Sequence, residues 1–442
     1  MKLKYSLAAT VTVGALAMGA LTGCSTAAGG SGSADTITYW ASNQGPSLEA
    51  DKTILTESLA RYTKETGINV ELEVIPWANL YTRILTAVAS GEGPDVLNIG
   101  NTWAVTLQQT GAFVPFEGEA LDAVGGQERF VQTSWATGGA ADQAPTSIPL
   151  YGLAYSLYYS PSMFAAAGIT EPPATWDEFV EDAKALTVDT DGDGAIDQYG
   201  VALAGSSISN NAHQAFSRGL QAGGSLYDAD GTPTLASDEQ VAGVKQWVDL
   251  MAVDKVVAPG SAEYTEGNAM VDDFINGNAA MFLDQNPVSN FESRDFTDWA
   301  IAPVPLNDLN ASGDKATMSH VAGINLSVFE NSDNKEAALE LAAHLTSTSE
   351  QEYLAAAFGS LPVATAAYDN PTFQTEEVSV KQKILANSSL PMPLVPSEGQ
   401  METLVGTAIK DLFARAAQGQ TVTEDDVRAA LENANTQLTA AL

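Results

Sequence analysis

Residues 69–74 read Asn-Val-Glu-Leu-Glu-Val, a strict alternation of polar and apolar side chains that predicts a half-buried β-strand. The segment before it, residues 46–66, carries apolar residues on one helical face and is followed by Gly67, a common helix stop. After the strand, a second helical pattern leads to another apolar strand at residues 95–99. Strands that alternate with helices predict βαβ units and a largely parallel sheet, so the expected fold class is α/β.

The same alternation returns farther along the chain. Further strands are expected at residues 147–159, 201–204, 279–283 and 299–305, and further helices at 175–186, 241–253, from 333, from 347 and from 424 onward. Two winding patterns in one long α/β chain predict two lobes. The ligand is then expected between the lobes, where the carboxyl ends of the strands meet.

The first 35 residues have the composition of an export signal followed by a linker. Two lysines precede an apolar stretch, and Leu21-Thr22-Gly23-Cys24 has the form of a bacterial lipobox. Cys24 is the only cysteine of the chain, and a Gly/Ser run follows it. We expect residues 1–23 to be a signal peptide, Cys24 to carry a lipid, and residues 24–35 to be a flexible tether at the extracellular face of the cell membrane. The alternative is an ordinary signal peptide with an incidental cysteine.

The composition argues against several classes of function. The formal net charge of −36 repels nucleic acid and anionic lipid, so only the lipid anchor is expected to hold the protein at the membrane. The three histidines lack metal-ligand spacing, and no Gly-x-Ser-x-Gly motif occurs. We therefore expect a protein that is not an enzyme and that requires no cofactor.

Loops rich in amides and tryptophan follow the strands that end at Trp40, Ile99 and Leu283. A sugar offers ring C–H groups to flat aromatic faces and hydroxyl pairs to amides or carboxylates. The candidate binding residues in and near these loops are Trp40, Asn43, Gln44, Trp77, Asn101, Trp103, Asp284 and Asn286. Loss of Trp103 is expected to weaken binding with modest loss of stability. Trp247, at a helical core position, should affect stability alone.

An acidic segment at residues 189–197 has the spacing of the first part of a calcium loop. Asp189, Asp191, Asp193 and Asp197 occupy loop positions 1, 3, 5 and 9, with a glycine at position 6. Position 12 is Gly200 instead of the bidentate glutamate. The segment is therefore either a structural calcium site completed by another acid or a solvated polar turn.

Several segments together resemble the extracellular solute-binding proteins of carbohydrate ABC importers, the maltose-binding-like group of family 1. The resemblance rests on the order and spacing of the segments and covers nearly all of the chain after the signal. The segments are ITYW at 37–40, GPDV at 93–96, LYYS at 157–160, FAAAGI at 164–169, PPATWDEF at 172–179, FINGNAAMF at 274–282, NKEAA at 334–338 and LPV at 361–363. The chain departs from the family at Ala322-Gly323, where two glycines are common.

The resemblance implies a two-lobed periplasmic-binding-protein-like fold of type II, with the ligand cleft between lobes joined by hinge crossovers. Lobe 1 is expected to contain residues 36–148 and about 304–355, and lobe 2 residues 149–303 and about 356–442. Tyr151, His320 and Gly323 complete the candidate binding residues. The expected partners are an oligosaccharide and the membrane subunits of an ABC importer, with the binding protein as a monomer.

These expectations describe a substrate-binding lipoprotein that captures an extracellular oligosaccharide and delivers it to an ABC importer. Two alternatives from other classes stay open. One is a surface-anchored glycan-degrading enzyme, and the other is a binding protein for a non-sugar solute such as a peptide.

Overall fold

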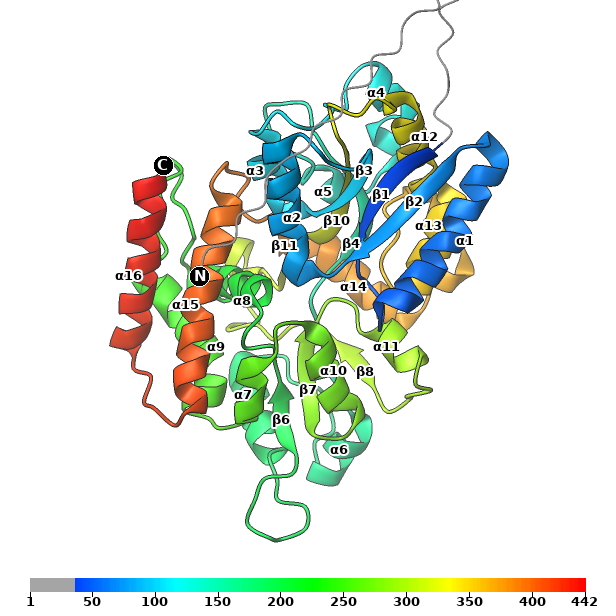
Figure 1. Ribbon diagram of the computed structural model, residues 1–442. Helices are drawn as coiled ribbons and strands as arrows, with labels where there is room; N and C mark the ends of the chain where they lie inside the picture. The colour runs from blue at the N-terminus through cyan, green and yellow to red at the C-terminus, as the bar shows by residue number, and fades with distance from the viewer. Residues whose placement is uncertain (1–35) are drawn as a thin grey trace, which may run out of the picture. The chain divides into compact units, whose positions relative to one another are not determined.

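The computed structural model describes residues 36–442 (Figure 1). The predicted signal peptide, Cys24 and the whole predicted tether lie outside these residues. Within residues 36–442, no helix combines the length and the apolar character that crossing a bilayer requires.

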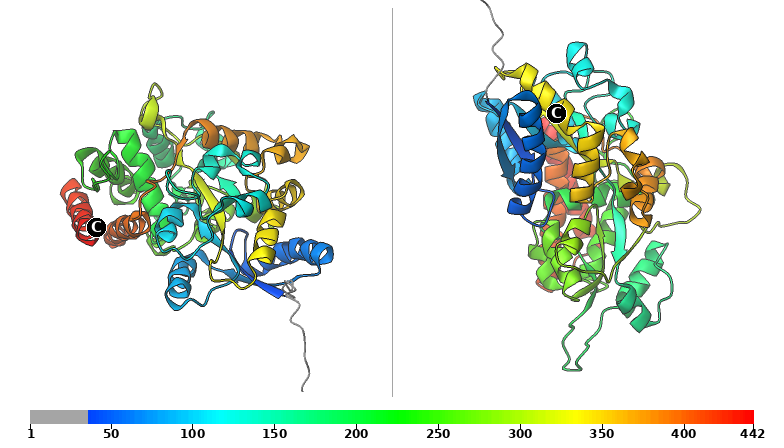
Figure 2. Two further views of the ribbon diagram at one scale, coloured as in Figure 1. Left: turned by 90° about the horizontal axis from the view of Figure 1, so that it is seen from above. Right: turned by 90° about the vertical axis from the view of Figure 1, so that its right-hand side faces the viewer.

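The first sheet has five strands in the order β2-β1-β3-β10-β4. Its strands are β1 (Thr36–Ser42), β2 (Asn69–Ile75), β3 (Val96–Gly100), β4 (Ile148–Leu153) and β10 (Ala322–Val328). One face is covered by α1 (Leu48–Thr66), α12 (Lys335–Leu345) and α13 (Thr348–Phe358), and the other by α2 (Trp77–Ser90) and α3 (Ala104–Gln108). Figure 2 shows α1, in blue, beside the yellow helices.

The second sheet has four strands in the order β6-β7-β5-β8. These strands are β5 (Ser156–Tyr159), β6 (Tyr199–Ala202), β7 (Ala279–Asp284) and β8 (Ala300–Ala302). Its larger core contains residues of α6 (Pro161–Ala167), α7 (Trp176–Ala185), α8 (Ile208–Ala222), α9 (Asp238–Ala252), α15 (Glu398–Ala417) and α16 (Glu424–Ala441). A smaller core holds α10 (Gly267–Ile275) and α11 (Val288–Glu292). The remaining elements include α4 (Glu119–Ala123), α5 (Gln132–Trp135), α14 (Glu376–Asn387) and the short paired strands β9 (Ser319–His320) and β11 (Ser389–Leu390).

The α/β class is confirmed, and the strands of each main sheet share one direction except β10 in the first sheet and β5 in the second. In the two main sheets only the pairs β1–β2, β1–β3 and β6–β7 are parallel, whereas β10 and β5 run antiparallel to both of their neighbours. The chain reaches β5 and β10 by passing from one sheet to the other. It therefore enters each sheet at the edge where the neighbouring strands end, and it must run in the opposite direction.

Local signals explain where the helices begin and end. Helix α7 opens with a capping box, in which Thr175 accepts from the Glu178 N–H and Glu178 accepts from the Thr175 N–H. Helix α1 ends at Gly67, whose φ of 80° suits a residue without a Cβ. Helix α12 begins at Lys335, with Asn334 at its N-cap position, two residues after position 333 from which the helix was expected.

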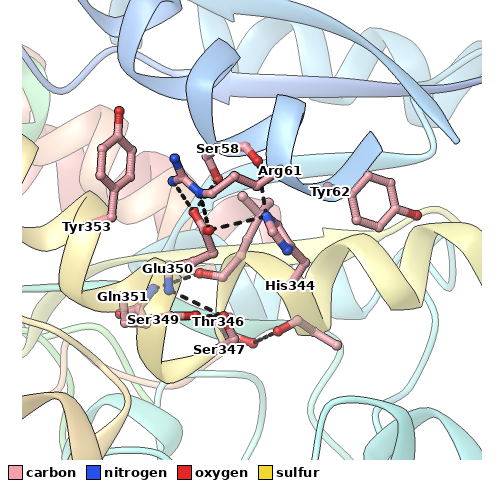
Figure 3. A network of polar contacts seen from close by, with 12 residues as sticks. Ser58, Arg61, Tyr62, His344, Thr346, Ser347, Ser349, Glu350, Gln351 and Tyr353 are labelled. Carbon is pink, nitrogen blue, oxygen red and sulfur yellow. Dashed lines mark hydrogen bonds and ion pairs between the residues drawn. The ribbon is translucent and has the colours of Figure 1, made fainter. Parts of the chain in front are cut away.

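Glu350 joins α13 to α1 through a buried polar network (Figure 3). Its carboxylate accepts hydrogen bonds from Arg61 Nε (2.5 Å), Arg61 Nη2 (2.6 Å) and Ser58 Oγ (2.7 Å), and His344 Nε2 lies 3.7 Å away. Burial by itself would raise the pKa of Glu350. The hydrogen bonds from Arg61 and Ser58, together with the nearby charges, outweigh burial and hold the pKa below its ordinary value.

Glu350→Gln is expected to lower the free energy of unfolding by about 2 kcal/mol at neutral pH, because it removes charge-assisted hydrogen bonds. The pKa of Glu350 is lower in the folded state than in the unfolded state. The extra stability of the wild type is therefore fully present above the unfolded-state pKa and is lost as the pH falls through the folded-state pKa. Urea unfolding of both proteins across that pH range measures the difference. Glu340→Gln, an exposed acid on α12, is the control, and an equal effect of the two variants would contradict this account.

Candidate functional site

A cavity of about 540 Å³ is lined by residues of both sheets and of the helices beside them. The loops that follow β1, β3 and β7 contribute residues from the carboxyl ends of these strands, and α2, α8 and α15 complete the wall. The volume lies within the roughly 300–1,000 Å³ of typical small-molecule sites.

Nine of the eleven candidate binding residues line this cavity. They are Asn43, Gln44, Trp77, Asn101, Trp103, Asp284, Asn286, His320 and Gly323. The fold therefore brings together loops that are far apart in the sequence.

Trp40 and Tyr151 are not among the lining residues, so their predicted location is wrong. Trp40 lies on the side of β1 that faces α2, where the guanidinium of Arg83 stands 4.2 Å from its ring centroid. Tyr151 is fully buried in the core of the first sheet and packs edge-on against Phe358. Side chains alternate between the two faces of a strand, so both rings lie on a face of the sheet rather than at its end.

The loop after β1 is held in place by buried Asp51. The Asp51 carboxylate accepts hydrogen bonds from the N–H groups of Gln44 (3.0 Å) and Gly45 (2.7 Å). Burial raises the pKa of Asp51 to about 6, although these hydrogen bonds lower it. The side-chain oxygen of Asn43 accepts from the Trp77 N–H (2.9 Å) and so supports the start of α2.

Asn101 connects the end of β3 to the start of β10. Its side-chain nitrogen donates to the carbonyl oxygen of Val321 at 2.7 Å. Gly323 stands beside this contact, and a Cβ at that position would lie 2.8 Å from the carbonyl oxygen of Tyr151. The single glycine is thus required by the approach of the neighbouring strand β4.

Three aromatic rings form one wall of the cavity. The Trp103 ring lies 5.5 Å from that of Trp77 in an edge-on arrangement and 4.8 Å from that of Tyr81. Trp77 and Tyr81 are partly exposed, whereas only 6% of Trp103 is exposed and it belongs to the core between the sheet and α2. Trp103 therefore supports the rings of Trp77 and Tyr81 from the core side, and we now expect its loss to cost more stability than the modest loss expected from the sequence.

His213 and His320 stack on each other with ring centroids 3.9 Å apart. Tyr155 lies beside them, with its hydroxyl 3.2 Å from His213 Nδ1 and 3.0 Å from Asn210 Oδ1, to which it donates. Burial lowers the pKa of His213 to about 3 and that of His320 well below its ordinary value. Both imidazoles are consequently neutral at neutral pH.

Asp284 and Asn286 place polar groups at the end of β7. Asp284 Oδ1 accepts from the Asn286 N–H (2.7 Å), and Asn286 Nδ2 donates to the Phe358 carbonyl oxygen (2.6 Å). Burial raises the pKa of Asp284 to about 6. On α15, Glu402 accepts from the hydroxyl of Thr102 (3.0 Å) and also lines the cavity.

The lining residues that were not predicted include Tyr81, Tyr155, His213 and Glu402. Tyr81 follows Trp77 by four residues on α2, so helical periodicity could have indicated it. The other three carry no local signal, because only the tertiary fold brings their segments to the cavity.

The acidic segment at residues 189–197 lies away from this cavity. Carboxylate oxygens of Asp189, Asp191 and Asp197 lie within 4.8 Å of one another, whereas Asp193 is not part of this group. Asp193 instead accepts a hydrogen bond from the Ala195 N–H. The predicted ligand set is therefore reduced to three acids.

The family model described as bacterial extracellular solute-binding protein matches residues 45–352. The chain belongs to this family. A putative binding protein of Brucella abortus is 26% identical to this solute-binding protein over 308 residues, which cover 69% of each chain.

Solved structures of solute-binding proteins share the fold. A protein from Thermotoga lettingae bound to α-D-tagatose superposes with a TM-score of 0.78 at 22% identity, covering 92% of this chain and 100% of that one. A maltose-bound protein from T. maritima gives 0.76 at 23% identity, with coverage of 92% and 100%. The two-lobed architecture expected from the sequence is thereby confirmed.

Proposed function

We propose that this solute-binding protein captures an extracellular sugar in the cavity between its two sheets and delivers it to an ABC importer. The observation that carries the proposal is the lining itself. The partly exposed rings of Trp77 and Tyr81 line the same cavity as the amide of Asn286 and the carboxylate of Asp284. Rings stack on the C–H faces of a sugar, while planar polar groups pair with its hydroxyls. The sugar-bound solved structures with the same fold support this choice of ligand class.

A thermal-shift screen against neutral mono- and oligosaccharides, followed by calorimetric titration of the positive ligands, tests the proposal. The sugar should be recovered intact after incubation, since we propose binding without catalysis. Cleavage of the sugar would support the enzyme alternative, and a response only to peptides would support a non-sugar solute.

We also propose where the two lobes divide. The strands β1 to β4 and β10 form lobe 1, and β5 to β8 form lobe 2. Because β4 pairs with β10 as far as Leu153, we place the first crossover at residues 154–155 instead of 148. The later crossovers stay at about 304 and 356. We also propose that the protein acts as a monomer.

Cys24→Ala is expected to release the protein from the membrane fraction while sugar affinity stays unchanged. Each buried methylene of a lipid chain contributes about 0.8 kcal/mol of membrane affinity, and the acidic chain offers no electrostatic substitute. Cell fractionation with immunoblotting measures the distribution. A variant that remains fully membrane-bound would contradict the lipid anchor.

We propose that Asp189, Asp191 and Asp197 bind a structural calcium ion. Calcium at a hundredfold excess over its dissociation constant should add about 2.7 kcal/mol to the free energy of unfolding. The melting temperature should therefore rise with added calcium and fall again with a chelator. Asp191→Ala should abolish the response. Asp193→Ala, which removes the acid outside the group, should retain it. A melting temperature that ignores calcium would identify the segment as a solvated turn.

A further inference from the structure

Glu398 and Glu402 are two buried acids one turn apart on α15. Only 1% of Glu398 and 4% of Glu402 is exposed. Glu402 lines the cavity, whereas neither carboxylate oxygen of Glu398 has a hydrogen-bond partner among residues 36–442. The ion pairs formed within residues 36–442 include neither acid.

Two buried carboxylates without a cation repel each other and are poorly solvated. The N-terminal end of α15 supplies roughly half a positive charge, which offsets less than one of the two negative charges. Burial and the charge of Glu402 raise the pKa of Glu398 well above its ordinary value. Burial also raises the pKa of Glu402, although hydrogen bonds from Ser209, Thr102 and Trp103 oppose it. Without a cation beside it, the pair is therefore favoured in its protonated form, and a bound cation would favour its ionisation.

Tyr81 brings the aromatic wall to these acids. Its hydroxyl lies against Gly399, between the two glutamates in sequence, at a point where a Cβ would collide with it. Burial and the charges of Glu398 and Glu402 raise the pKa of Tyr81 to about 12. Carboxylates beside aromatic faces are the surroundings that stabilise an ammonium group.

The lining contains two further acids, Glu266 and Asp284, and one base, Lys410. Lys410 lies two turns beyond Glu402 on α15, and no ion pair between them occurs within residues 36–442. The lining thus carries more negative than positive charge.

We propose that the sugar bound in this cavity carries a protonated amine, which is held by Glu402 beside the rings of Tyr81 and Trp103, while buried Glu398, one turn away and outside the lining, adds negative charge. The proposal rests on the sugar-binding function proposed above and specifies the class of sugar. The amine would place a positive charge beside the two glutamates. The rest of the sugar would contact Trp77, Asn286 and Asp284.

Matched sugars test this proposal by calorimetric titration at neutral pH, where amines are mostly protonated and the two acids are not neutralised by an acidic buffer. Glucosamine, galactosamine, mannosamine and the chitosan disaccharide are each compared with the hydroxyl sugar of the same configuration. Each is also compared with its N-acetyl derivative, which keeps the nitrogen but not the charge. At least one amino sugar should bind about tenfold or more tightly than both of its partners.

Glu402→Gln and Glu398→Gln should each remove this preference. Asp411→Asn removes an exposed acid from the same helix and should keep it. The wild-type comparison decides the question even where a variant fails to fold.

Three outcomes would overturn the proposal. If neutral sugars bind as tightly as every amine, the cationic ligand is wrong while the proposed sugar-binding function stands. If no sugar of either kind binds, both proposals fail. A calcium-induced rise in melting temperature that Glu402→Gln removes would assign the pair to a metal ion instead.

Discussion

Trp77→Ala is expected to weaken sugar binding more than tenfold while most of the stability is retained. Trp77 lines the cavity, is partly exposed and touches Trp103 only edge-on. Truncation of an aromatic anchor at a binding hot spot typically costs at least ~2 kcal/mol of affinity. Little core packing depends on the exposed part of the ring, so the free energy of unfolding should change much less than with a buried tryptophan.

Calorimetric titration and urea unfolding of three tryptophan variants separate the two effects. Trp40→Ala is the matched control, because this half-buried indole lies outside the cavity and should leave affinity unchanged. Trp103→Ala should lose both affinity and about 3–5 kcal/mol of stability, since 94% of the residue is buried behind the wall. If Trp77→Ala binds as tightly as Trp40→Ala, the stacking platform is not on α2.

Trp247→Ala is expected to lower the free energy of unfolding by about 3–5 kcal/mol and to leave the affinity of the folded fraction unchanged. Trp247 lies on α9 with 5% of its surface exposed and packs edge-on against Phe413 of α15. Its indole N–H donates to Asn211 Oδ1 (3.2 Å). The variant therefore creates a cavity and also leaves a buried acceptor without its donor.

Trp247→Phe provides the intermediate case, because it keeps an aromatic ring but loses the N–H donor and part of the indole volume. Its loss of stability should lie between those of the wild type and the alanine variant in urea unfolding. A Trp247→Ala protein that is as stable as the wild type would show that this part of the core repacks without loss. If Trp247→Ala folds but binds sugar more weakly, Trp247 helps to position the residues that line the cavity.

Much of the fold could be predicted from local patterns. Helix α7 and its capping box depend on Thr175 and Glu178, three residues apart, and the strand at 69–75 depends on alternation along a single segment. The same locality explains the site residues that were found, since Asn101 and Asp284 directly follow or end strands at the edge where ligands bind.

The sequence by itself determined the element types, the α/β class and most loops of the site, because hydrophobic periodicity and capping act over a few residues. The tertiary structure decided the rest. It turned β5 and β10 antiparallel by routing the chain between two sheets, and it buried Trp103 behind Trp77. It also brought His213 onto His320 and Glu402 to Thr102. Contacts between segments 100 to 300 residues apart depend on how whole layers pack, and no local pattern encodes that packing.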